Sequence, residues 1–272
     1  HLMSQGRIIT YEQDGQPIEA WEFPLEATEA ISTEMRPTSS RAAASDRQAP
    51  QETRKAKPYS SPDTEKSINI KDPDRIWQTR HLAQKRAGKL PPKALSLIDT
   101  INRETEAFNL SVELILAIIE TESAFNPMAK SPVPAYGLMQ IVPESAGQDV
   151  TAKIFGRPRL LSPSYLYNSA NNIKVGSAYF NILYYNYFKT VENPRSRFYC
   201  SIAAYNTGPG NVAQTLKEGD TSLSEAARVA NTMDPEQVYQ HLISNLPYEE
   251  TVHYLPKVTA RVDKYESMLM VQ

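Results

Sequence analysis

The most informative stretch of this chain spans residues 111–127 and reads SVELILAIIETESAFNP. Ser111 is a favourable helix N-cap, Glu113 would lie near the positive end of the helix dipole, and Pro127 ends the segment. Between these signals, the predicted helix over about residues 112–124 is apolar on almost every face. Because such a helix must be buried all round, we expect it at the centre of an all-α domain.

One acidic side chain, Glu122, lies on the apolar side of this predicted helix. Glu122 follows Ile119 by three residues and Ile115 by seven, so its carboxyl group shares their face. Burial would raise its pKa, and a carboxyl group still protonated near neutral pH can act as the general acid in glycosidic bond cleavage. The alternative is a structural ion pair with a lysine such as Lys130. Glu120 points roughly the opposite way, which favours a structural or solvated charge.

From about residue 72 onward, apolar residues recur at helical spacing between Asn, Pro and Gly. A second long helix is predicted over about residues 172–188, and it carries more aromatic rings than one core-facing stripe needs. We expect Phe180 and Leu183 in the core and some of the other rings along a groove.

The N-terminal part has a different pattern. Alternation over residues 7–13 and 16–23, joined by Asp-Gly, predicts a β-hairpin. Residues 35–67 are rich in Pro, Ser, Ala, Arg and Lys and poor in large apolar side chains, which is typical of a linker. We therefore predict a hairpin and linker over residues 1–70, either packed on the main domain or left from a larger N-terminal domain, and a catalytic domain over residues 71–272.

Composition excludes several classes of function. A net charge of −2 gives no sign of nucleic acid binding, which normally shows as a surplus of Lys and Arg. Cys200 is the only cysteine, so an internal disulfide and a cysteine-based metal cluster are excluded, and we expect it to be buried. The scattered histidines show no metal-ligand spacing, and we expect no cofactor.

Four motifs at compatible distances resemble the soluble lytic transglycosylase domain of family-one enzymes. They are ESAFNP at 122–127, KSP at 130–132, GLMQ at 137–140 and AYNTGPG at 204–210. The resemblance covers about residues 94–265. It implies a lysozyme-like helical fold and a peptidoglycan-cleaving enzyme.

Within that family, residues 151–163 and 231–239 look most similar to membrane-bound lytic transglycosylase C. This resemblance implies a periplasmic protein whose partner is the peptidoglycan glycan strand. It also implies attachment to the outer membrane through a lipid on an N-terminal cysteine, which is absent from this sequence. The oligomeric state is left open.

The resemblance assigns roles by position. Glu122 matches the single catalytic acid/base, and Tyr205 matches the catalytic tyrosine beside it. The positions that match substrate-binding residues are Ser131, Met139, Gln140, Asn206, Glu250 and Tyr254. In the family, the serine hydroxyl hydrogen-bonds the catalytic carboxyl group, and the methionine and glutamine border the acetamido sugar.

Each role has a structural alternative. Ser131 could cap a turn before Pro132, and Tyr205 could be an ordinary core tyrosine. The chain also has Val252 where the family often has arginine, so a salt bridge from that position to Glu250 is not expected.

The resemblance implies a mechanism with one carboxyl group. The acid protonates the glycosidic oxygen, the acetamido group of N-acetylmuramic acid attacks its own anomeric carbon, and the C6 hydroxyl closes a 1,6-anhydro ring. Most glycosidases instead use two carboxylates, but substrate-assisted families are exceptions. The alternatives are a lysozyme-like hydrolase that uses water, and a non-catalytic peptidoglycan-binding module.

Overall fold

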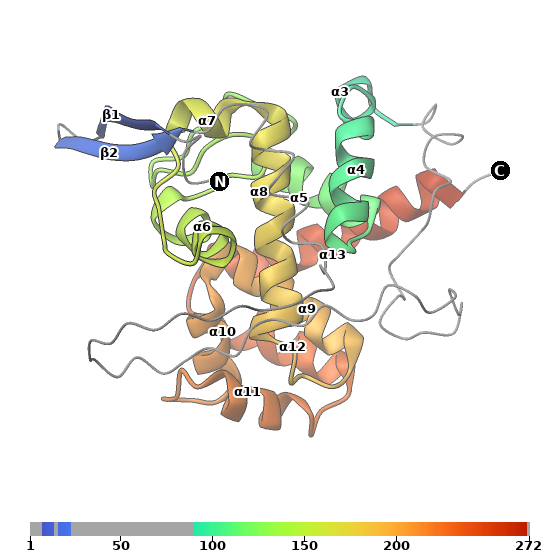
Figure 1. Ribbon diagram of the computed structural model, residues 1–272. Coiled ribbons are helices and arrows are strands. Elements are labelled where there is room, and N and C mark those ends of the chain that lie inside the picture. The colour runs from blue at the N-terminus through green and yellow to red at the C-terminus, as the bar shows by residue number, and fades with distance from the viewer. Residues whose placement is uncertain (1–6, 14–15, 23–89, 271–272) are drawn as a thin grey trace, which may run out of the picture.

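The computed structural model describes residues 7–13, 16–22 and 90–270, and Figure 1 shows their arrangement. The predicted linker lies outside the described residues. A hairpin of β1 (Arg7–Gln13) and β2 (Gln16–Glu22) precedes the helices. The helices are α3 (Pro92–Leu95), α4 (Ile98–Phe108), α5 (Val112–Ser123), α6 (Gln148–Phe155), α7 (Pro163–Tyr167), α8 (Ser169–Ile182), α9 (Pro194–Thr207), α10 (Pro209–Leu216), α11 (Leu223–Ala230), α12 (Pro235–Asn245) and α13 (Glu249–Met270), with π-helical turns η4 (Pro143–Gly147) and η5 (Leu183–Tyr187).

The hairpin confirms the predicted strands. β1 and β2 pair antiparallel from Arg7 opposite Glu22 to Gln13 opposite Gln16. Pro17 lies opposite Glu12, and in a two-stranded sheet every strand is an edge, where proline is tolerated.

Helix α5 is the buried central helix that the sequence predicts. The Ser111 hydroxyl group accepts a hydrogen bond from the Leu114 amide at 3.2 Å, which caps the first turn. All residues from 112 to 119 are buried, and the helix ends where Ala124 adopts a left-handed conformation, with φ 48°. The long C-terminal helix α13 packs along α5, so residues from both helices meet at the end of α5.

Helix α8 runs through the domain, while α10, α11 and α12 gather near one end of it (Figure 1). It begins at Ser169, earlier than predicted, because the Asn168 side chain accepts a hydrogen bond from the Asn171 amide at 3.0 Å. Phe180 and Leu183 are fully buried, which confirms their predicted place in the core. Cys200 is also fully buried, as predicted.

The loop between α5 and η4 is fastened to α8. The Asn172 side chain accepts a hydrogen bond from the Met139 amide at 2.7 Å and donates one to the Tyr136 carbonyl oxygen at 2.7 Å. Gly137 has φ +78°, and a Cβ atom there would lie 2.4 Å from the Asn172 Nδ2 atom, so only glycine fits. This clamp fixes the position of Gln140 at the edge of the loop.

The described helical domain, which follows a short hairpin in the chain, confirms the predicted all-α fold class. No helix in the described part of the chain is long and apolar enough to cross a membrane.

We expect a chain that lacks residues 1–70 to fold and to retain its specific activity, because the linker composition implies few contacts across it. Its Tm should lie within about 2 °C of the full chain, which corresponds to under about 1 kcal/mol for a domain of this size. Thermal unfolding and a turnover assay would check this. Aggregation of the shortened chain would instead make the hairpin an integral part of the domain.

Candidate active site

Glu122 lies in the last turn of α5, partly buried, with its carboxyl group held by α13. Its Oε1 atom accepts a hydrogen bond from the Tyr254 hydroxyl group at 2.6 Å. Burial raises the pKa of Glu122 to about 7; the Tyr254 hydrogen bond opposes this shift, and the charge of Glu250 adds to it. This carboxyl group can therefore be protonated near neutral pH and can still lose its proton.

The alternative ion pair with Lys130 does not form. The Lys130 ammonium group lies 5.8 Å from the centre of the Tyr136 ring instead. Glu122 therefore has no basic partner among the described residues. In this it differs from Glu120, two positions earlier.

Glu120 is a structural glutamate, as the sequence predicts. Both of its carboxylate oxygens accept hydrogen bonds from Lys264 at 2.8 Å, and Arg261 lies 3.5 Å away. Burial of Glu120 opposes ionisation, but the interactions with Lys264, Tyr265 and Arg261 outweigh it and hold its pKa below the usual value. Helices α5 and α13 are thus tied together by this ion pair as well as by the Glu122–Tyr254 contact.

Tyr205, from α9, faces the same region. Its hydroxyl group donates a hydrogen bond to the Met139 carbonyl oxygen at 2.9 Å, and its ring packs on Tyr179 with a centroid distance of 5.5 Å. Burial, followed by the charge of Glu122, raises the pKa of Tyr205 well above its ordinary value. The hydroxyl group therefore stays protonated, and its lone pairs remain able to accept a hydrogen bond.

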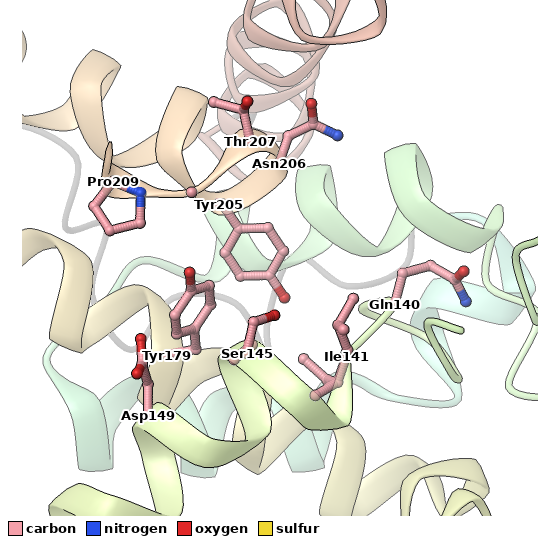
Figure 2. A pocket seen from close by; sticks show the side chains of 12 residues that line it. Gln140, Ile141, Ser145, Asp149, Tyr179, Tyr205, Asn206, Thr207 and Pro209 are labelled. Carbon is pink, nitrogen blue, oxygen red and sulfur yellow. The ribbon is translucent and has the colours of Figure 1, made fainter. Parts of the chain in front are cut away.

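A cavity of about 270 Å³ opens beside Tyr205 (Figure 2). Its lining residues are Gln140, Ile141, Val142, Ser145, Ala146, Asp149, Tyr179, Tyr205, Asn206, Thr207, Gly208 and Pro209. Glu122 is not one of them, but Tyr205 lies within electrostatic range of it. Tyr205 therefore lies between the cavity and the Glu122 carboxyl group.

Two predicted substrate-binding residues line this cavity. Gln140 has φ 47°, and its side-chain amide donates hydrogen bonds to the carbonyl oxygens of Gly137 at 2.8 Å and Ala129 at 3.1 Å. With both N–H groups used, its side-chain oxygen remains as an acceptor for a ligand N–H group. Asn206 is fixed by a hydrogen bond from the Thr251 hydroxyl group to its Oδ1 atom at 2.6 Å.

Met139 and Ser131 are placed differently from the prediction. The Met139 side chain is fully buried in the core against Gly176, where an added Cβ atom would lie 2.4 Å from its sulfur, so only its carbonyl group reaches the site. The Ser131 hydroxyl group donates to the Val133 carbonyl oxygen and accepts from the Ala135 amide. The predicted hydrogen bond from Ser131 to the catalytic carboxyl group is therefore not formed, and the serine caps a turn.

The C-terminal segment lies beside Glu122. Tyr254 is almost fully buried and contacts Glu122 directly. Glu250 is exposed and lies close enough to raise the pKa of Glu122. Val252 packs against the hydrophobic core.

Sequence reasoning missed polar residues of the cavity, among them Asp149. Its Oδ2 atom accepts a hydrogen bond from the Tyr187 hydroxyl group at 3.0 Å, and burial raises its pKa. An acidic residue in the first turn of a helix is common, so nothing in the sequence around Asp149 indicated a place in the site.

Replacing Tyr254 by phenylalanine should shift the pH dependence of activity. The Tyr254 hydroxyl group lowers the pKa of Glu122, so its loss should raise that pKa above about 7. The alkaline limb of the pH–rate profile should then shift to higher pH. We also expect kcat to fall about tenfold, because a charge-assisted hydrogen bond that orients the acid is lost.

The matched control is Tyr265→Phe, on the same helix, since that hydroxyl group interacts with Glu120. It should leave the alkaline limb in place. An unchanged limb in Tyr254→Phe would contradict the proposed role of the contact.

Comparison with known proteins identifies related chains. Residues 99–227 match the family model described as Transglycosylase SLT domain. A "Membrane-bound lytic murein transglycosylase C" from Serratia proteamaculans (strain 568) is 40% identical over 178 residues, which covers 65% of this chain and 48% of that protein. A protein of the same name from Klebsiella pneumoniae (strain 342) is 39% identical over 176 residues, 65% of this chain and 48% of that protein.

These relatives confirm the sequence resemblance to this transglycosylase group. The chain spans about half the length of the curated relatives that it matches. Among solved structures, an inactive mutant of lytic transglycosylase Slt from Pseudomonas aeruginosa is similar, with a TM-score of 0.46 and 31% identity, covering 63% of this chain and 24% of that one.

Proposed function

We propose that this chain is a lytic transglycosylase acting on peptidoglycan, because residues 99–227 match the Transglycosylase SLT domain. The proposed reaction cuts the β-1,4 bond between N-acetylmuramic acid and N-acetylglucosamine and leaves 1,6-anhydro ends. The observation that carries the proposal is the partly buried Glu122 carboxyl group, with a pKa raised to about 7 and oriented by Tyr254. Such a group can donate a proton and take one back within a single turnover.

In the first step, Glu122 protonates the glycosidic oxygen as the C1–O bond breaks. The acetamido carbonyl oxygen of the same muramic acid attacks C1, which forms an oxazolinium ion. Because Oε1 of Glu122 accepts the hydrogen bond from Tyr254, its Oε2 atom is the one available to the substrate. The lone pairs of Tyr205 and the side-chain oxygen of Gln140 are acceptors that would orient the acetamido N–H group.

In the second step, the ionised Glu122 removes the proton from the C6 hydroxyl group. The C6 oxygen attacks C1, the oxazolinium ring reopens to the acetamido group, and a 1,6-anhydro ring forms. Glu122 is protonated again at the end, and no water is consumed. The C6 hydroxyl group is intramolecular, which gives it a large advantage over a water molecule.

The setting that we propose is the periplasm, with attachment to the outer membrane through a lipid on the whole protein. The support is the name shared by the relatives, which describes them as membrane-bound.

The first experiment is turnover of purified sacculi. Release of soluble muropeptides by the wild-type chain is expected, and a non-catalytic binding module would release none. Glycans that lack the N-acetyl group at the cut should resist cleavage, because nothing then replaces a second carboxylate. Efficient cleavage of such glycans would overturn the acetamido mechanism.

A further inference from the structure

Among the residues that the structure describes, Asp149 is the only charged side chain lining the cavity beside Tyr205. Figure 2 shows Asp149 next to Tyr179 on one wall, and the charge of Asp149 contributes to the raised pKa of that tyrosine. The Tyr187 hydroxyl group, from η5, fixes one carboxylate oxygen at 3.0 Å. One oxygen of Asp149 is thus anchored to the protein, which orients the other.

A structural role in helix capping does not account for this aspartate. Helix α6 has no side-chain cap, and it continues from η4, where the Gly147 amide already bonds to the Val142 carbonyl oxygen at 3.1 Å. Asp149 is half-buried, and no basic side chain lines the cavity among the described residues. Burying a carboxylate that has one tyrosine donor costs free energy, so a ligand that supplies a second donor would offset it.

The other lining residues describe that ligand. The rings of Tyr179 and Tyr205 give flat apolar walls, while Asn206 and Thr207 offer neutral polar groups. A volume of about 270 Å³ is close to the lower end of small-molecule pockets, roughly 300–1,000 Å³, and leaves room for a single ring. An apolar face with hydroxyl groups along its rim is the chemistry of a sugar ring. A carboxylate-bearing group would be repelled by Asp149.

We propose that Asp149 is a specificity residue that accepts a hydrogen bond from a hydroxyl group of a neutral N-acetylhexosamine ring in this cavity and keeps carboxylate-bearing groups out. Tyr187 is its positioning residue. The proposal rests on the proposed function, since it assigns one sugar of the glycan strand to the cavity.

The test measures binding and turnover separately. In a Glu122→Gln background, which prevents cleavage, calorimetric titration with chitotetraose should give a Kd about five- to tenfold weaker when Asp149→Asn is added, because a charged acceptor becomes a neutral one. In the active chain, Asp149→Asn should raise KM on sacculus-derived glycans by a similar factor and leave kcat within about twofold. Tyr187→Phe should change KM in the same direction by a smaller factor.

Asp263→Asn is the matched control, since Asp263 is an exposed aspartate on α13 and the charge change is the same. It should alter neither Kd nor KM. Equal chitotetraose binding with and without Asp149→Asn would overturn the proposal, as would an effect on kcat alone. Failure of the proposed function would look different, because wild-type chain would then release no muropeptides, whatever the effect of Asp149→Asn on binding.

Discussion

Substituting Glu122 by glutamine should abolish turnover, with a loss of at least about 10³-fold, while glycan binding persists. An amide has nearly the same shape as the carboxyl group and can still accept the Tyr254 hydrogen bond, but it cannot shuttle a proton. The measurement is the initial rate of muropeptide release, together with binding of chitotetraose to the variant.

The same substitution should stabilise the fold at alkaline pH. The pKa of Glu122 is raised from 4.5 to about 7 in the folded chain. Between these values, the unfolded chain releases a proton that the folded chain retains, so stability falls as pH rises and the cost is complete above about pH 7. Glutamine removes this cost, so the Tm of Glu122→Gln relative to wild type should be higher at pH 8 than at pH 4.

Glu113→Gln provides the matched control. Glu113 lies at the start of the same helix, and burial raises its pKa to about 7 as well. It should show the same dependence of Tm on pH but keep full activity. Substantial residual turnover in Glu122→Gln would remove Glu122 from its role.

Tyr205→Phe should lower kcat roughly 10- to 100-fold, because Tyr205 lines the cavity and its hydroxyl group holds the Met139 carbonyl group next to Gln140. One buried hydrogen bond is lost at a cost of about 1–2 kcal/mol, so Tm should fall by only about 2–6 °C. Steady-state kinetics and thermal unfolding on the same preparation would separate the two effects.

Tyr199→Phe is a suitable control for this variant. Tyr199 lies on the same helix, and its hydroxyl group accepts a hydrogen bond from Arg195 at 2.7 Å outside the cavity. A comparable Tm change with unchanged activity is expected there. If Tyr205→Phe behaved like this control, Tyr205 would be an ordinary core tyrosine.

The local features of the fold were predictable from the sequence. The buried helix α5 follows from the apolar run and its Ser111 cap, both of which act within a few residues. The hairpin follows from alternation around Asp-Gly in the same way. These predictions hold because caps, turns and apolar periodicity are decided by near neighbours in the chain.

The details of the candidate site were less predictable. The Ser131 hydroxyl group bonds within its own loop, and Met139 turns into the core because its backbone is clamped by Asn172, 33 positions later. Asp149 was missed because its partner Tyr187 is 38 positions away. Only the packed structure brings such partners together. The family resemblance assigned Tyr254 to the site, but its hydrogen bond to Glu122 was not predicted.

The most direct test of the account is the mass of the glycan ends that this chain releases from purified peptidoglycan. A single carboxyl group assisted by the substrate acetamido group predicts muropeptides that end in a 1,6-anhydro sugar, lighter by one water than a lysozyme product. These ends should resist borohydride, because they have no reducing group. Reducible N-acetylmuramic acid ends as the main product would contradict the transglycosylase mechanism and would favour a hydrolase that uses the same acid.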